Sequence, residues 1–195
     1  MGLMILIAGL VLFLGMHATR IPDDHRRAGL VARLGKNRYR LLYSVISAIG
    51  LVLIVYGYSL ARLQPVFVWS PPVAMRHVAA LLMLVSMIFL VASYVPRNHL
   101  KARLRHPMTL SVKVWALAHL LANGTLADLL LFGSFLLWAV LLFKAARKRA
   151  VPMGFAGEEP TLTGTLATIG IGAVAWVVFA AWLHVLLIGI NPLGG

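Results

Sequence analysis

The 195-residue sequence contains no cysteine and only five acidic residues, and charged residues of any kind make up 12% of it. Without cysteine the chain has no disulfide bond, iron–sulfur cluster, thiolate haem ligand, covalently attached c-type haem or cysteine-based zinc site. A soluble domain carries about twice this share of charged residues. The low charge therefore excludes an ordinary cytosolic globule, a disordered chain and a nucleic-acid-binding domain. The seven histidines become the residues to follow for metal chemistry.

Apolar residues are plentiful: they make up 61% of the sequence, and its mean hydropathy is +0.91. A helix that crosses the hydrocarbon core of a bilayer needs about 20 such residues in succession. Six candidate segments are present: Leu3–Met16 extending toward Ile21, Leu41–Leu60, His77–Val95, the short Met108–Ala122, Leu126–Phe143 and Gly164–Ile190. We therefore expect an all-α fold, a polytopic membrane bundle of about six transmembrane helices that forms a single domain over residues 1–195.

The basic residues are segregated among the connections between these segments. Arg20–Arg40 holds seven Lys or Arg residues, Pro96–Pro107 holds four and Lys144–Arg149 holds four, whereas the other connections hold only Arg62 and Arg76. Cytoplasmic loops of membrane proteins retain positive charge. The net charge of +13 thus indicates an orientation, with the basic loops inside and both termini outside, and not a nucleic-acid partner.

Three further segments carry local signals. Asp24–Leu34 is basic and predicts a short amphipathic helix that lies along the lipid headgroups. Asn123–Gly124 predicts a tight turn that joins the fourth and fifth spans as a hairpin. Asp128 stands at the start of the fifth span, and we interpret it as the cap of that helix.

Polar residues inside a membrane span are costly, and here they concentrate in one stretch. It comprises Arg105-His106-Pro107-Met108, Lys113, Trp115, His119 and Asn123. His106 precedes a proline, so we expect it just before the first turn of the fourth span. Lys113 either extends its amine to the inner surface or pairs with an anionic lipid headgroup or a haem propionate. Trp115 and His119 are four residues apart and are expected on one face.

His119 and His17 point most directly to metal chemistry. His119 lies about 11 residues, or about 16 Å, from the inner end of its span, where it either bonds across helices or ligates a haem iron. His17, near the inner end of the first span, is either an interfacial histidine or a second ligand. The depths of His17 and His119 in the membrane differ by about 8 Å. A haem with two histidine ligands holds the backbones of those histidines about 12–13 Å apart, so a tilted haem would bridge this difference. An outer pairing of His119 with His184 or His77 is the competing geometry.

Several of these residues belong to a longer pattern. It consists of Leu12-Phe13-Leu14-Gly15-Met16-His17, Arg105-His106-Pro107-Met108, Lys113, Trp115-Ala116, His119-Leu120-Leu121-Ala122-Asn123-Gly124, Asp128-Leu129-Leu130 and Phe132-Gly133-Ser134. Over nearly the whole chain this pattern resembles the NnrU family. The resemblance implies a multi-pass protein of the bacterial inner membrane whose genes accompany nitrite and nitric oxide reduction, and hence a link to denitrification.

That family is similar to the plastid 15-cis-zeta-carotene isomerase, a membrane enzyme that uses haem b. The two haem histidines of that relative match His17 and His119. The resemblance therefore implies a haem b with these residues as axial ligands, and we expect Lys113, Arg105 and His106 near its propionates. The expected function is nitrogen-oxide metabolism or membrane redox chemistry, with the lipid bilayer and possible nitrogen-oxide respiratory proteins as partners.

Three alternatives accompany this hypothesis. One is haem-dependent cis–trans isomerisation of a carotenoid-like polyene. The plastid relative has a cysteine, implicated in ligand exchange at its haem, at the position of Ala116, and the alanine here argues against this activity. Another is an S-adenosylmethionine-dependent membrane methyltransferase, since Arg105–Met108 looks like the Arg-His-Pro motif of the isoprenylcysteine carboxyl methyltransferase type. Those enzymes also carry a glutamate-rich C-terminal signature. Here Glu158 and Glu159 precede the last span and no acidic residue follows Gly164, so this signature is incomplete. The last is a non-catalytic assembly factor for a reductase.

Overall fold

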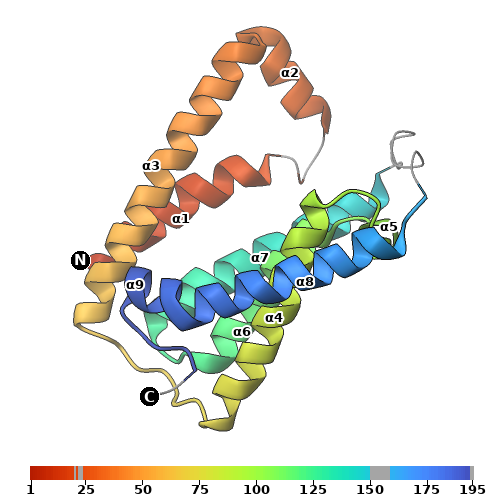
Figure 1. Cartoon of the computed structure of the whole chain (residues 1–195). Helices are drawn as coiled ribbons and strands as arrows, with labels where there is room; N and C mark the ends of the chain where they lie inside the picture. The colour runs from red at the N-terminus through yellow and green to blue at the C-terminus, as the bar shows by residue number, and fades with distance from the viewer. Residues whose placement is uncertain (20, 22–23, 150–158, 194–195) are drawn as a thin grey trace. The chain divides into compact units, whose positions relative to one another are not determined.

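The computed structural model describes residues 1–19, 21, 24–149 and 159–193, and it confirms the all-α prediction over them. The elements in chain order are α1 (Gly2–Ala18), α2 (Asp24–Leu34), α3 (Lys36–Leu63), α4 (Ala74–Tyr94), α5 (His99–Leu104), α6 (Pro107–Ala122), α7 (Leu126–Lys148), α8 (Leu162–Val178), the π-helical turn η2 (Phe179–Leu183) and α9 (His184–Ile188) (Figure 1). Each of the six predicted apolar segments is helical.

Four helices are long and apolar enough to cross a membrane: α3, α4, α7 and the continuous helix Leu162–Ile188 formed by α8, η2 and α9. The other two apolar helices, α1 and α6, have 17 and 16 residues. At 1.5 Å per residue each covers about 25 Å, slightly less than a hydrocarbon core of about 30 Å. The count of six crossings and their orientation therefore stay predictions.

Several helix boundaries differ from those predicted. α3 begins at Lys36 and α7 continues to Lys148, so both helices extend past their apolar segments into basic residues. Lys and Arg are good helix formers, and their long side chains reach polar surroundings from a helix end. The last apolar segment contains η2 and ends at Ile188. The predicted helix Asp24–Leu34 is present as α2, whereas α5 has no counterpart among the predicted elements.

The chain divides into two compact units. The first comprises Met1–Trp69 and Gly124–Ala146, and so contains α1, α2, α3 and most of α7. The second comprises Ser70–Asn123 and Arg147–Gly195, with α4, α5, α6 and the α8–α9 helix. Each unit is described by itself, and the single domain over residues 1–195 stays a prediction.

In the first unit, α1 and α3 lie side by side with their backbones in contact (Figure 1). Glycines on both helices make this possible. A Cβ atom on Gly9 would lie 2.6 Å from the backbone nitrogen of Ile54, and one on Gly50 would lie 2.8 Å from that of Phe13. Small residues of this kind allow membrane helices to approach closely. The position of α1 against α3 is therefore set by backbone sterics.

In the second unit, α4 packs against both α6 and α8. Two buried serines join α4 to α6: Ser86 Oγ donates to the backbone oxygen of Ser111 at 3.0 Å, and Ser111 Oγ donates to that of Ser86 at 2.8 Å. On the α8 side, a Cβ on Gly172 would lie 2.8 Å from the Cα of Ile88. Hydroxyl bonds and one close glycine contact thus hold these three helices together.

Candidate functional site

His17 lies on the last turn of α1, half-buried inside the first unit. Its ring nitrogen Nδ1 is 2.7 Å from the backbone oxygen of Phe13, one turn earlier in the same helix. A carbonyl oxygen only accepts hydrogen bonds, so Nδ1 carries a proton, and the tautomer that fits this bond has its lone pair on Nε2. This is the tautomer that ligates a metal through Nε2.

Four aromatic side chains from three helices gather at His17, and we call them the aromatic cage: Phe13 of α1, Tyr43 of α3, and Phe135 and Trp138 of α7. The His17 ring stacks on Phe13 with the centroids 4.2 Å apart and the planes at 27°. Tyr43 lies at 5.3 Å, and Trp138 at 6.1 Å is nearly perpendicular to the imidazole. Phe135 adjoins Phe13 at 5.9 Å. The first unit alone thus gives this imidazole an aromatic, apolar environment.

Two buried polar atoms of the first unit have no hydrogen-bond partner among the described residues: Nε1 of Trp138 and Oγ of Ser47. Trp138 belongs to the aromatic cage. Ser47 lies one turn after Tyr43 on α3 and three residues before Gly50, which touches Phe13. Nearly all buried polar groups in proteins have a partner, often an ordered water or a ligand. Trp138 Nε1 is therefore a buried donor on a ring that contacts His17, and Ser47 Oγ is a second buried polar atom, on the helix that supplies Tyr43.

His119 lies on the last turn of α6 in the second unit, where it is half-buried. Its Nδ1 is 2.9 Å from the backbone oxygen of Trp115, so this ring also keeps its lone pair on Nε2. The Trp115 ring lies 5.2 Å from the imidazole, as expected for residues four apart on one face. Asn123 Nδ2 donates to the backbone oxygen of His119 at 2.9 Å. His119 therefore repeats the local arrangement found at His17.

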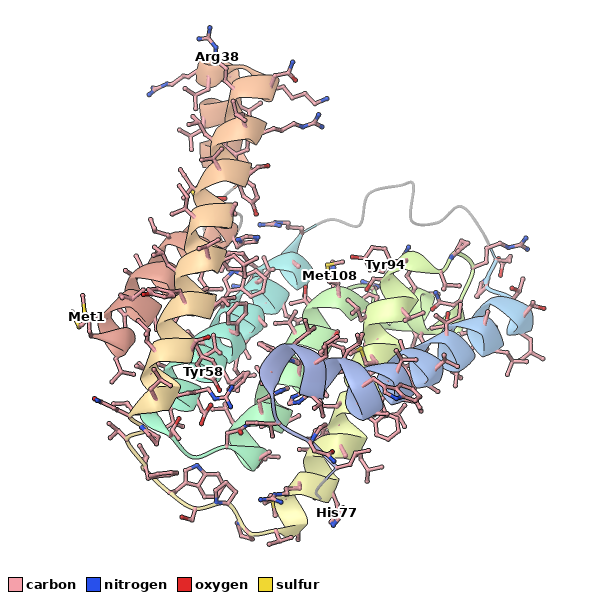
Figure 2. All side chains as sticks on the ribbon, turned by 60° about the vertical axis from the view of Figure 1, so that its left-hand side comes forward. Met1, Arg38, Tyr58, His77, Tyr94 and Met108 are labelled. Carbon is pink, nitrogen blue, oxygen red and sulfur yellow. The ribbon has the colours of Figure 1, made fainter. Side chains whose placement is uncertain are left out.

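The two predicted ligands belong to different units, so their pairing on one iron stays a prediction. Of the alternatives, His184 has its Nδ1 2.7 Å from the backbone oxygen of Ile190, and His77 is exposed near the start of α4 (Figure 2). Across the described part of the chain, no three or more histidine, aspartate or glutamate side chains are placed to hold a metal ion together.

Arg105, His106 and Lys113 complete the predicted site, and all three lie in the second unit. Arg105 is exposed and follows the end of α5 with a positive φ of 62°. His106 directly precedes Pro107, the first residue of α6, as the sequence predicts. Lys113 is half-buried within α6. Their expected place near haem propionates stays a prediction.

The basic segment that leads into α6 is tied to the start of α8. The backbone oxygen of Arg97 accepts a hydrogen bond from the backbone nitrogen of Thr161 at 2.7 Å, and His99 Nδ1 lies 2.7 Å from Thr165 Oγ1. Of the two acids weighed for a methyltransferase, Glu159 is exposed and its backbone oxygen accepts from Arg97 Nε at 3.3 Å, whereas Glu158 lies outside the described residues.

Asp128 is buried in the first turn of α7, with 5% of its surface exposed, and it takes part in capping that helix together with Thr125, the residue before the helix, and not alone as predicted. Its Oδ2 accepts from the backbone nitrogen of Thr125 at 3.0 Å and from Thr125 Oγ1 at 2.6 Å. Thr125 Oγ1 in turn accepts from the backbone nitrogen of Asp128 at 3.3 Å, which completes a capping box. Sequence reasoning missed Tyr58 of α3, whose hydroxyl donates to Asp128 Oδ1 at 2.5 Å, because no local pattern signals it.

The prediction of a tight turn at Asn123–Gly124 is wrong. Asn123 is extended, with φ −127° and ψ 144°. The Gly124 oxygen accepts from the backbone nitrogen of Val68 at 2.8 Å, and the backbone nitrogen of Leu126 donates to the Val66 oxygen at 2.8 Å. A Cβ on Gly124 would overlap the backbone oxygen of Trp69. The chain is held extended because it pairs with the segment after α3 instead of closing on itself.

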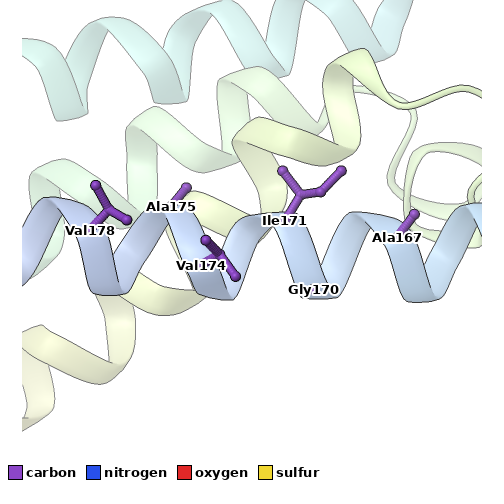
Figure 3. Close-up of a pocket in the computed structure, with 6 residues that line it drawn as sticks. All are labelled: Ala167, Gly170, Ile171, Val174, Ala175 and Val178. Carbon is purple, nitrogen blue, oxygen red and sulfur yellow. The ribbon is translucent and has the colours of Figure 1, made fainter.

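One shallow hollow lies along a face of α8 (Figure 3). Its lining comes from this helix alone: Ala167, Gly170, Ile171, Val174, Ala175 and Val178. These side chains are all apolar and include no metal ligand or titratable group. The hollow therefore adds no chemistry to the candidate site, which consists of the surroundings of His17 and His119.

Comparison with known proteins gives one match. A family model described as "NnrU protein" matches residues 5–192, which is nearly the whole chain. No curated protein and no solved structure matches the chain. The family model confirms the resemblance inferred from the sequence pattern.

Proposed function

The chain belongs to the NnrU family, and from this premise we propose that it is a multi-pass protein of the bacterial inner membrane that binds haem b. In this proposal His17 and His119 are the axial ligands, and the protein acts in nitrogen-oxide metabolism or membrane redox chemistry. The role in nitrogen-oxide metabolism rests on what the family resemblance implies. The haem rests on the chemistry of the two histidines.

The observation that carries the proposal is the state of the His17 ring. The bond from Nδ1 to the Phe13 carbonyl fixes both the orientation of the ring and its tautomer, as outer-shell hydrogen bonds do for metal-binding histidines. Iron in haem is held by such a neutral imidazole nitrogen. The aromatic cage adds flat, apolar surfaces of the kind that a porphyrin ring packs against. The residues at His17 therefore fit a haem.

His119 supports the second ligand in the same way, through its bond to the Trp115 carbonyl and the adjacent Trp115 ring. A haem with two histidine ligands has both axial positions filled, which favours electron transfer or redox sensing. A variant that lacks one histidine would leave an axial position open to a small ligand. Lys113, Arg105 and His106 are the proposed cationic groups for the haem carboxylates, because they lie on α6 or directly before it.

The visible spectrum of the detergent-purified protein, produced with ample haem, tests this function. We expect a Soret band that shifts on reduction with dithionite. We expect His17→Ala and His119→Ala each to lower haem occupancy or change the band, whereas the control His99→Ala leaves it unchanged, because the exposed His99 ring bonds to Thr165.

The absence of a Soret band in the haem-supplied protein would overturn the proposed function. A band that survives both ligand substitutions, but changes in His184→Ala or His77→Ala, would overturn the ligand assignment alone. Both outcomes are read directly from the spectra.

We also propose that the basic ends of the helices lie on the inner side of the membrane. Lys36, Arg38 and Arg40 are exposed on the first turns of α3, and Figure 2 shows nitrogen-bearing side chains around Arg38. Positive charge of this kind is retained in the cytoplasm next to anionic lipids. Reporter fusions after Leu34 and after Val68 are expected to report opposite sides, and the same side for both would overturn the six-span arrangement.

A further inference from the structure

The aromatic cage and the two buried polar atoms beside it form a more complete site than a lone histidine. α1 and α3 run antiparallel, with Gly9 against Ile54 and Phe13 against Gly50. Continued by one turn, this register places Ser47 opposite the end of α1 that carries His17. Ser47 also continues the stripe of residues at spacings of three and four through which α3 faces α1.

Trp138 approaches the same position from α7. Phe135 and Trp138 are three residues apart on that helix, and they contact Phe13 and His17 respectively. Three helices of one unit therefore converge on the His17 ring. Two of them bring a buried polar atom that has no partner among the described residues.

The donor set defines the chemistry of what fits there. The indole Nε1–H only donates, so its partner must be a hydrogen-bond acceptor. A serine hydroxyl also donates, and two donors that share one partner suit a carboxylate. His17 Nε2 offers a lone pair, which suits a metal ion. A ligand that combines a metal with a carboxylate on a flat apolar frame satisfies all three groups.

We propose that Trp138 Nε1 and Ser47 Oγ bind a propionate of the haem whose iron His17 ligates. This inference rests on the proposed function and deepens it, because it assigns two positioning residues that are not among those of the sequence pattern. It also gives a partner to each of two buried polar atoms in a membrane protein, where an unsatisfied group is costly.

The test compares haem b with its dimethyl ester, in which both propionates are esterified, in titrations of haem-free protein followed at the Soret band. For haem b, we expect Trp138→Phe to weaken binding about tenfold and Ser47→Ala about threefold, as for loss of an ordinary hydrogen bond. For the ester, we expect the wild type to bind about tenfold more weakly than it binds haem b, and each variant to differ from it by less than about twofold.

Two further readouts separate a ligand contact from a structural role. The frequency of the resonance Raman band of propionate bending is expected to shift in Trp138→Phe. It is expected to be unchanged in the control Trp69→Phe, because the Trp69 side chain lies outside the aromatic cage. The thermal unfolding of the haem-free protein is expected to be unchanged in Ser47→Ala, because Ser47 Oγ has no partner among the described residues to lose.

Each contrary result has a distinct meaning. If the wild type binds no haem, both this inference and the proposed function fail. If haem binds through His17 while Trp138→Phe and Ser47→Ala bind haem b as the wild type does, this inference alone fails, and the two atoms hold only water. If the variants lose the same affinity for haem b and for the ester, Trp138 and Ser47 act through packing, which also overturns the proposal.

Discussion

His17 and His119 make the same hydrogen bond to their own helices, but the helices that carry them, α1 and α6, are joined to their neighbours α3 and α4 in different ways. In the first unit, glycine contacts bring the backbones of α1 and α3 together, and an aromatic cage from three helices surrounds the histidine. In the second unit, the pair Ser86–Ser111 joins α4 to α6 through hydrogen bonds. Steric contact tolerates no added atom, whereas a hydroxyl bond is lost at modest cost. The contact between α1 and α3 should therefore be more sensitive to substitution than the contact between α4 and α6.

The largest expected effect concerns the buried carboxylate of the first unit. Asp128→Ala removes the cap of α7 and leaves the Tyr58 hydroxyl without its acceptor, so we expect a loss of about 3 kcal/mol in the free energy of unfolding. Equilibrium unfolding in mixed micelles measures it. Tyr58→Phe removes only one of these bonds and is expected to cost about 1–1.5 kcal/mol. Equal losses in the two variants would contradict the role of the capping box.

The next effect tests the glycine contact between α1 and α3. Gly9→Ala places a Cβ 2.6 Å from the backbone nitrogen of Ile54, and the forced separation is expected to cost about 2 kcal/mol even though alanine favours a helix. Gly15→Ala is the matched control on the same helix, because a Cβ there meets nothing within 4 Å. We expect it to leave stability unchanged or raise it by up to about 1 kcal/mol. The same response at both positions would show that the close approach does not limit α1.

The smallest effect concerns the second unit. Ser86→Ala removes the hydroxyl that bonds to Ser111, and interhelical bonds of this kind contribute about 0.6–1 kcal/mol in membrane proteins. The matched control is Ser93→Ala on the same helix, whose hydroxyl donates to the Phe89 backbone oxygen one turn back. We expect a smaller loss there. If Ser86→Ala destabilises the protein more than Gly9→Ala does, the contrast between the two units is wrong.

Local chemistry could be predicted well from the sequence. The apolar segments are helices because their length and composition favour helices in a bilayer, and the Thr125–Asp128 capping box acts within one turn. Pro107 begins α6 because proline suits the first turn of a helix. The bonds from His17 and His119 to carbonyls four residues earlier are likewise set by helix geometry.

Contacts between distant segments could not be predicted. The extended conformation at Asn123 depends on the pairing of Gly124 with residues near Val68, and a two-residue signal for a turn carries no information about that partner. The bond between Tyr58 and Asp128 joins helices that are 70 residues apart. The apolar sequence around Trp138 does not distinguish this tryptophan from tryptophans that only pack against other helices.

The sequence by itself determined the membrane character, the helical fold, the family and the histidines to follow, because each depends on composition or on residues within a few turns of one another. The tertiary structure decided which side chains face those histidines. It brought Tyr43 and Trp138 to His17, because backbone contact between α1 and α3 fixes their register and α7 covers the same end. Because the sequence has no cysteine, histidine was the metal ligand to consider. The aromatic surroundings of His17 depend on the packing of three helices.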